Sequence, residues 1–288
     1  MNAVKIGVLP WRIGRGGFER WAKRLDREVA QAAWAGARLL VMPEYAPLEL
    51  ALGEAPDLPG ELSRGIAGAS AALATMQTVA RRHKVWLVPG TLPFALDGRV
   101  VNRAPLLAPD GSLAFQDKHV MTRFEAEEWG ISPGAPPAVF DTEFGRIGIA
   151  ICFDAEFPAL VRAQVEAGAW LVLVPTCTDT AHGFSRVRIA ARARAMENQC
   201  FVAVAPTVGD APWSGALDTN VGQAGIYGPV DRGFPASGIL AEGDMNAANW
   251  VFAELDPARL EAVRHDGAVR NHLSWPASPP PARPARFA

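Results

Sequence analysis

The chain has 288 residues, of which 49% are hydrophobic, and its formal net charge is −2. A chain of this length can bury a large core without a metal or a disulfide framework, so one compact domain is the simplest expectation. The charge is close to neutral and no block of like charge stands out. This argues against nucleic-acid and membrane-surface partners and favours a small molecule.

Residues 1–11 show no basic segment followed by a long apolar run, and no apolar run approaches the roughly 20 residues that span a bilayer. We therefore expect a cytoplasmic protein. The three cysteines, Cys152, Cys177 and Cys200, lack the spacing of a structural zinc site or a disulfide framework. We expect no metal and at least one free thiol.

Short apolar runs recur along the chain, and each is typical of a buried strand. They cover residues 4–9, 39–42, 85–88, 147–151, 171–174 and 201–205. Helical patterns lie between several of them, and in the first, over residues 18–33, Trp21, Leu25 and Val29 share one face. Alternating strands and helices predict an α/β architecture.

Residues 100–108 and 113–117 are two further strand-like runs, separated by the turn sequence Pro109-Asp110-Gly111-Ser112. They predict a hairpin, and therefore a mixed sheet. The stretch from 276 to 288 is rich in proline and poor in apolar residues. We expect it to form an extended arm that follows a single domain over residues 1–275.

Three predicted strands end at a residue with reactive chemistry: Glu44, Lys118 and Cys152. Ligands of α/β proteins gather at the carboxyl ends of strands. A carboxylate, an ammonium and a thiol together can perform nucleophilic acyl chemistry. Taken singly, each residue also has a structural interpretation: a small buried cysteine, a turn at the end of a strand, and a solvated lysine.

The sequence around these residues resembles the amidase-type branch of the nitrilase-like (carbon-nitrogen hydrolase) superfamily, from about Val4 to about Ala262. Four blocks carry the resemblance in the family's order: Val41-Met42-Pro43-Glu44-Tyr45, Asp117-Lys118-His119, residues 145–154 with Phe157-Pro158, and residues 191–198. The resemblance implies a four-layer α-β-β-α sandwich of two mixed β-sheets and no cofactor. It also implies a homodimer or a larger even homo-oligomer that pairs through outer helices.

The resemblance further implies that Cys152 is the nucleophile, Glu44 the general base, and Lys118 the cation that stabilises tetrahedral intermediates. A base that takes the thiol proton and later returns it needs a pKa near neutrality, which burial can produce. The backbone N–H of Phe153 would be a second donor to the oxyanion. One such donor commonly contributes about 3 to 4 kcal/mol.

Family members often carry a second glutamate shortly before a Pro-Gly pair, which here is Pro133-Gly134. By its distance to this pair Glu127 is the best match, and it would orient Lys118 and help keep it protonated. Glu125 and Glu128 stay open as alternatives. A solvated acidic loop is the structural interpretation.

Substrate contacts are less constrained by the sequence. Arg123 lies five residues after Lys118 and could bind a substrate carboxylate, or it could neutralise the neighbouring glutamates. Four residues that follow strand ends are expected either to line the pocket or to pack in the core: Tyr45, Phe153, Thr176 and Cys177.

The predicted function is hydrolysis of a small linear amide to a carboxylic acid and ammonia, with ω-amides of dicarboxylic acids as the favoured substrates. Nitriles and N-carbamoyl compounds are alternatives, because the same three residues support their hydrolysis. A non-catalytic scaffold with the same fold is the alternative from a different class. Retention of Glu44, Lys118 and Cys152 argues against the scaffold.

Overall fold

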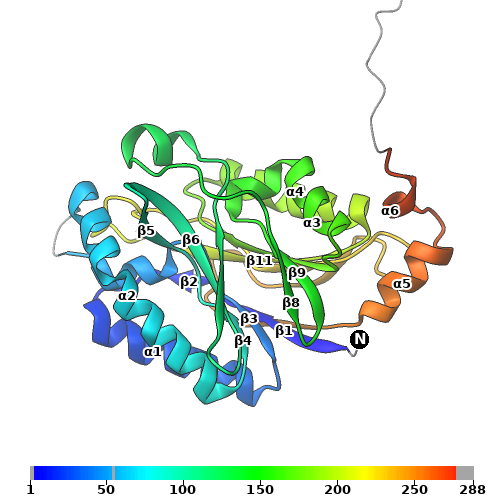
Figure 1. The fold of residues 1–288 in the computed structure, drawn as a ribbon, viewed down its shortest axis with the longest axis horizontal. Helices are drawn as coiled ribbons and strands as arrows, with labels where there is room; N and C mark the ends of the chain where they lie inside the picture. Colours follow the sequence, from blue (N-terminus) through cyan, green and yellow to red (C-terminus); the bar gives the residue numbers. More distant parts are fainter. Residues whose placement is uncertain (1–2, 54–55, 277–288) are drawn as a thin grey trace, which may run out of the picture.

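The computed structural model describes residues 3–53 and 56–276. The proline-rich arm predicted from residue 276 lies outside this part of the chain, apart from Pro276 itself. Within the described residues, strands form two seven-stranded mixed sheets that lie between two layers of helices (Figure 1). The predicted four-layer sandwich is confirmed.

The first sheet has the order β14-β1-β3-β4-β6-β5, and β7 also pairs with β6. Its strands are β1 (Val4–Val8), β3 (Leu39–Val41), β4 (Trp86–Val88), β5 (Leu92–Leu96), β6 (Arg99–Leu107), β7 (Leu113–Asp117) and β14 (Val251–Leu255). Strands β6 and β7 form the predicted hairpin, with Arg103 opposite Asp117. The pairs β1-β3 and β3-β4 are parallel, so the sheet is mixed.

The second sheet has the order β13-β12-β11-β10-β9-β8, and β2 also pairs with β11. Its strands are β2 (Trp11–Arg12), β8 (Val139–Thr142), β9 (Gly145–Ile149), β10 (Leu171–Thr176), β11 (Phe201–Val208), β12 (Gly225–Tyr227) and β13 (Ile239–Glu242). Strands β9, β10 and β11 run parallel at its centre. Their carboxyl ends therefore meet at one edge of the sheet.

Residues of β3 show why these strands are continuous apolar runs. Leu39 and Val41 pack with the second sheet, whereas Leu40 points to the opposite face and packs with Trp21 and Leu25. Successive strand residues alternate between faces, and here both faces are covered. An uninterrupted apolar sequence is the consequence.

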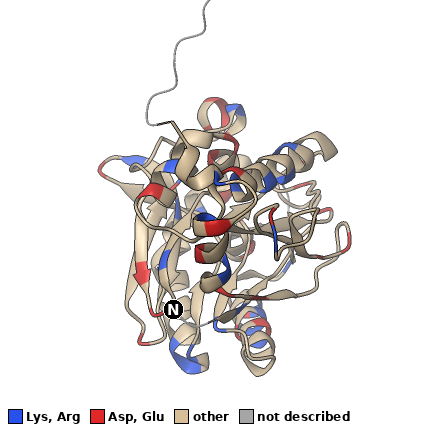
Figure 2. Cartoon of the chain, turned by 90° about the vertical axis from the view of Figure 1, so that its right-hand side faces the viewer, with Lys and Arg blue, Asp and Glu red and all other residues tan. Residues whose placement is uncertain are grey.

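Four helices form the outer layers: α1 (Gly17–Trp34) and α2 (Leu58–His83) on the first sheet, α3 (Pro158–Glu166) and α4 (Ala181–Asn198) on the second (Figure 1). Helices α5 (Pro257–Asp266) and α6 (Asn271–Ser274) follow the last strand. No helix among the described residues is long and apolar enough to cross a membrane. Basic and acidic residues are interspersed along the chain as Figure 2 displays it.

Three short helical segments lie at the ends of strands: the 3₁₀ helices η1 (Ala46–Ala51) and η3 (Cys152–Glu156), and the π-helix η2 (Phe124–Glu128). Segments η1 and η3 follow strands β3 and β9, and η2 follows β7. These connections carry the residues that the sequence singled out. Single π turns often occur at functional sites.

Candidate active site

Cys152 lies at the turn that follows strand β9. Its φ angle is 49°, a left-handed conformation that residues other than glycine rarely adopt. Its Sγ accepts a hydrogen bond from Thr176 Oγ1 at 3.2 Å and donates to the carbonyl oxygen of Cys177 at 3.5 Å. The end of strand β10 therefore fixes the position of the thiol.

Glu44 follows strand β3 and is 1% exposed. One carboxylate oxygen accepts from Lys118 Nζ and from Asn102 Nδ2, both at 2.8 Å, and the other accepts from the backbone N–H of Cys177 at 3.0 Å. Burial raises the pKa of Glu44 to about 7, against the opposing effect of Lys118. Near neutral pH this carboxyl can therefore both accept and return a proton.

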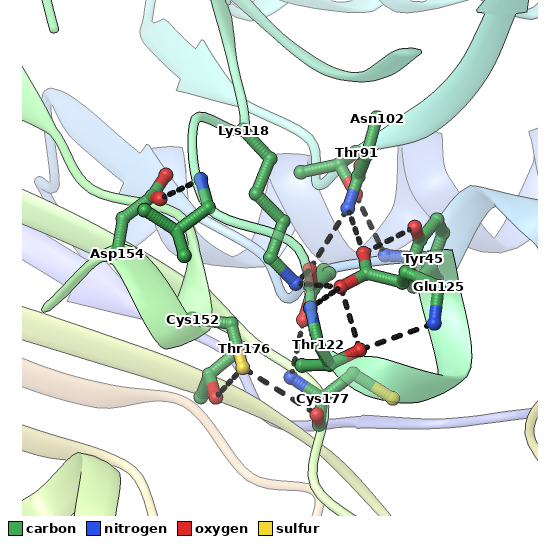
Figure 3. Close-up of polar contacts among 12 residues, drawn as sticks. Tyr45, Thr91, Asn102, Lys118, Thr122, Glu125, Cys152, Asp154, Thr176 and Cys177 are labelled. Carbon is green, nitrogen blue, oxygen red and sulfur yellow. Dashed lines mark hydrogen bonds and ion pairs between the residues drawn. The ribbon is translucent and has the colours of Figure 1, made fainter. Parts of the chain in front are cut away.

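Lys118 follows strand β7 and is 1% exposed. Its Nζ donates to Glu44 at 2.8 Å. It also donates to Glu125 at 2.6 Å (Figure 3). Burial alone would lower the pKa of Lys118, but the two carboxylates outweigh it and hold the pKa well above its usual range. The charged form of Lys118 is therefore favoured in the site.

Burial and the neighbouring Glu44 carboxylate raise the pKa of the Cys152 thiol well above its usual range, although Lys118 acts in the opposite sense. The resting site therefore holds a neutral thiol beside a carboxylate. Ionisation of the Cys152 thiol therefore requires a neighbouring base that takes its proton.

The choice of Glu127 as the second glutamate is corrected by the structure. Glu125 binds Lys118, whereas the Glu127 side chain is 57% exposed and pairs with Arg123 at 2.9 Å. Two residues apart on a helical turn, Glu125 and Glu127 point to roughly opposite sides. The distance in sequence to Pro133-Gly134 does not reveal which of the two glutamates points toward Lys118.

Lys118 is not the only residue that binds Glu125 among the described residues. Its oxygens accept from Tyr45 Oη at 2.8 Å, from Thr122 Oγ1 at 2.8 Å and from Asn102 Nδ2 at 3.2 Å. Burial opposes ionisation, but Lys118 and these donors keep the pKa of Glu125 below its usual value. The charged form of Glu125 is therefore favoured, and it holds Lys118 through a hydrogen bond of 2.6 Å.

Asn102, Thr122 and Asp154 are not among the site residues predicted from the sequence. Asn102 is fully buried in strand β6, but that strand also carries Arg99 and Arg103, so a polar residue at position 102 does not stand out in the sequence. Asp154 accepts from the backbone N–H groups of His119 and Val120, at 3.1 and 2.8 Å. It joins the loop that carries Lys118 to the turn that carries Cys152.

A cavity of about 790 Å³ opens onto these groups. Of the four residues predicted as pocket walls, Tyr45, Phe153 and Cys177 line it. Thr176 is buried behind the thiol and does not line this cavity. Thr176 instead donates a hydrogen bond to Cys152 and so supports the thiol.

Arg123 lines the outer part of the same cavity, and its side chain is 89% exposed. It forms two hydrogen bonds with Glu127 and none with Glu125. Arg123 therefore pairs with a neighbouring glutamate, as one of its two predicted roles requires. Arg186, which pairs with Glu156, is a second arginine of the cavity lining.

No group of three or more His, Cys, Asp or Glu side chains within residues 3–53 and 56–276 is arranged to hold a metal ion. The arrangement instead combines a buried cation, a carboxyl with a pKa near 7 and a thiol. These are the groups that nucleophilic acyl transfer with general acid–base catalysis requires.

The family model described as Carbon-nitrogen hydrolase matches residues 15–265. The chain is 33% identical over 269 residues to "Probable hydrolase YhcX" of Bacillus subtilis, a match that covers 93% of this chain and 52% of that protein. It is 28% identical over 248 residues to the chloroplastic omega-amidase of Arabidopsis thaliana, a match that covers 83% of this chain and 64% of that protein. The chain thus spans about half to two thirds of these relatives.

Solved structures show the same architecture. The amidase from Nesterenkonia sp. is 26% identical, with a TM-score of 0.74 over 92% of this chain and 94% of that one. A variant of that amidase, 25% identical with a TM-score of 0.75 over 95% and 97%, carries the acetamide moiety of fluoroacetamide on its active site cysteine. A branch 10 member of the nitrilase superfamily from Saccharomyces cerevisiae is 21% identical and matches in fold, with a TM-score of 0.73 over 92% and 94%.

Proposed function

The chain belongs to the carbon-nitrogen hydrolase family, and on this premise we propose that it hydrolyses the C–N bond of a small linear amide through an acyl-thioester on Cys152. One observation carries the proposal: the Glu44 carboxylate, with a pKa of about 7, shares a buried site with Lys118 and the Cys152 thiol. The relatives named as amidases support the same reaction class.

The first step forms a bond between Cys152 Sγ and the amide carbonyl carbon, while the thiol proton passes to Glu44. Because the pKa of the free thiol is high, the transfer has to accompany the attack. The carbonyl oxygen gains the negative charge. Lys118 is the cation that stabilises it, and the N–H of Phe153, which follows the nucleophile, is the proposed second donor.

Collapse of this intermediate breaks the C–N bond, and the protonated Glu44 gives its proton to the leaving nitrogen. Ammonia leaves and the acyl group stays on Cys152. A water molecule then gives a proton to Glu44 and attacks the thioester, and the second intermediate expels the thiol with return of that proton. The products are a carboxylic acid and ammonia, and Glu44 returns to its starting state.

The test is release of ammonia from a panel of amides, nitriles and N-carbamoyl compounds by the wild type and by Cys152→Ala. We expect ammonia from linear amides, no turnover by Cys152→Ala, and an acyl adduct on Cys152 when a slow substrate is followed by mass spectrometry. Cys200→Ala, in which another buried thiol is removed, is the control that should keep its activity. Turnover by Cys152→Ala would refute the mechanism.

The favoured substrates within this proposal are short ω-amides of dicarboxylic acids. Relatives named as omega-amidases and the presence of Arg123 and Arg186 in the cavity lining support the choice. Both arginines already pair with glutamates, so a substrate carboxylate has to compete with Glu127 or Glu156 for them.

Arg123→Ala should therefore lower kcat/KM for an anionic ω-amide by about ten-fold and leave a neutral amide of equal length within about two-fold. Arg186→Ala is the matched variant at the other arginine. An equal loss on the anionic and neutral amides in both variants would remove the support that these arginines give to dicarboxylic substrates.

A cytoplasmic location and a homodimer or larger even homo-oligomer complete the proposal. All three cysteines are free thiols, in keeping with a reducing compartment. Ile189 and Met196 are exposed apolar residues seven positions apart on helix α4, so they share one outward face. We propose that subunits pair through this face.

A further inference from the structure

The segment after strand β11 forms one side of the active-site cavity. Five of its residues line the cavity: Gly215, Ala216, Leu217, Asp218 and Thr219, which we call the 215–219 wall. The segment is closed on itself, because the N–H of Gly209 donates to the carbonyl of Asn220 at 2.8 Å and the N–H of Ala211 to that of Asp218 at 2.7 Å. It is therefore a compact loop whose placement depends on its anchors.

One anchor is Glu61 in the first turn of helix α2. Its side chain is completely buried, and one carboxylate oxygen accepts from the N–H of Gly215 at 2.7 Å. The other oxygen accepts from Ser214 Oγ at 2.8 Å and from the N–H of Ala216 at 3.2 Å. Both oxygens of a buried carboxylate are thus used to hold the beginning of the wall.

The first turn of α2 also supports a second part of the cavity. The carbonyl oxygen of Leu58 accepts from Trp129 Nε1 at 3.4 Å. The Trp129 ring packs edge-on against Tyr45 at 4.9 Å between ring centroids, and both side chains line the cavity. Gly215 lies so close to Leu58 that a Cβ on it would be 3.1 Å from the Leu58 nitrogen. A shift of the wall relative to α2 therefore changes the width of the cavity.

We propose that Glu61 is a positioning residue that sets the place of the 215–219 wall, and through it the size of the acyl group that the cavity accepts. This inference rests on the proposed amide hydrolysis. Glu61 is buried behind the loop, so it acts through the loop and not by contact with the substrate.

Glu61→Gln tests the proposal. In glutamine, one of the two carboxylate oxygens of Glu61 is replaced by an NH₂ group, which donates and cannot accept. Because this NH₂ group faces an N–H or O–H donor of the loop, at least one anchoring hydrogen bond is lost. For a long-chain amide such as hexanamide, KM should rise about ten-fold, equivalent to about 1.4 kcal/mol, with kcat unchanged within about two-fold. For acetamide, both constants should stay within about two-fold of the wild type.

Glu49→Gln is the matched control. Glu49 is 1% exposed and accepts from Trp11 Nε1 at 2.8 Å and from the N–H of Gly14 at 2.9 Å, but none of these three residues lines the cavity. Glu49 also pairs with Arg24 at 3.1 Å, and Gly14 accepts from Trp213 Nε1 at 3.2 Å, so this network touches the loop outside the 215–219 wall. The variant should therefore lower the melting temperature without a KM change that depends on chain length. A chain-length effect of the same size in Glu49→Gln overturns the proposal.

Ser214→Ala is the second variant, for the case that Glu61→Gln does not fold. It removes the hydroxyl that donates to Glu61 and that accepts from the N–H of Leu217 at 3.0 Å. The same selective rise in KM for hexanamide is expected. Equal changes for acetamide and hexanamide would assign Glu61 and Ser214 to stability alone.

Alkylation of Cys152 separates this inference from the proposed function, because it needs no turnover. Rates with iodoacetamide and with N-hexyl iodoacetamide, followed by mass spectrometry, report on the width of the cavity. If no amide is hydrolysed by the wild type, the proposed function fails, and the wall is still tested by the ratio of the two rates. Glu61→Gln should change that ratio by at least about five-fold, equivalent to about 1 kcal/mol, and an unchanged ratio overturns the inference.

Discussion

Glu125 and Glu127 are two carboxylates, two positions apart, in opposite environments. Glu125 is 2% exposed and bound to Lys118, whereas Glu127 is largely exposed and bound to Arg123. A hydrogen bond between charged groups in a buried site contributes more than an exposed ion pair, which is screened by solvent. The two glutamates therefore offer a matched pair of variants.

Glu125→Gln should lower kcat about 10-fold to 100-fold, whereas Glu127→Gln should stay within about two-fold of the wild type. Glu125 also contributes to the raised pKa of Glu44, so its neutralisation should move the acidic limb of the kcat/KM profile to lower pH. Steady-state kinetics across pH 5 to 9 checks both. A large loss in Glu127→Gln alone would restore Glu127 to the site.

Glu44 should impose a pH dependence on activity and on stability. The base has to be ionised, so kcat/KM should rise with pH through about 7, the pKa of Glu44 in the folded protein. Because this pKa is raised above its unfolded value, the protonated carboxyl contributes stability that is complete below about pH 4.5 and lost as pH rises through about 7.

Glu44→Gln cannot ionise, so it should lack activity yet gain stability relative to the wild type as pH rises from 5 to 8, by up to about 2 to 3 kcal/mol. Thermal melts of both proteins at the two pH values measure this difference. A stability gap that is the same at pH 5 and pH 8 would show that Glu44 does not titrate in this range.

At the scale of elements, the site depends on turns that come from different strands. The loop after β7 and the turn η3 meet through Asp154, which is 4% exposed and accepts from the N–H groups of His119 and Val120. The backbone of Gly134 lies so close to Asp117 that a Cβ on residue 134 would be 2.1 Å from the Cβ of Asp117. The Pro-Gly pair thus packs directly against the strand end that carries Lys118.

Asp154→Asn should destabilise the protein by about 1 to 3 kcal/mol, because the amide presents a donor to one of two buried N–H groups. It should also lower kcat, since Lys118 and Cys152 are no longer held together. Denaturant unfolding and kinetics test this, with Asp256→Asn as the control. Asp256 caps helix α5 at the surface, and asparagine is an equally good cap.

At the scale of the whole molecule, the two outer helix layers differ in their exposed apolar residues. Ile189 on α4 is 65% exposed, and Trp34 at the end of α1, on the opposite layer, is 91% exposed. We expect pairing through α4, so Ile189→Asp should shift the wild-type oligomer to a monomer, whereas Trp34→Asp should not. Size-exclusion chromatography with light scattering measures both. A monomeric wild type, or dissociation by Trp34→Asp alone, would contradict the α4 interface.

The sequence by itself determined the strand cores and the position of the reactive residues. Strands covered on both faces have to be continuous apolar runs, and such runs stand out in a sequence. The predicted runs match strands β1, β3, β4, β9, β10 and β11 within a few residues at either end. Glu44, Lys118 and Cys152 each follow the carboxyl end of a strand, which is where ligands of α/β proteins gather. Glu44 and Lys118 follow strands of the first sheet and Cys152 follows a strand of the second, so the packing of the two sheets brings the three together.

Only the tertiary structure decided which polar groups meet these residues. Asn102 and Glu44 are 58 positions apart, and Glu61 and Ser214 are 153 apart, so no local pattern links them. Which of Glu125 and Glu127 faces Lys118 depends on how the helical turn 124–128 is oriented against the site, and a count of residues does not reveal that orientation. Periodicity reports which face of a segment is buried, whereas a hydrogen-bond partner is set by how distant segments pack.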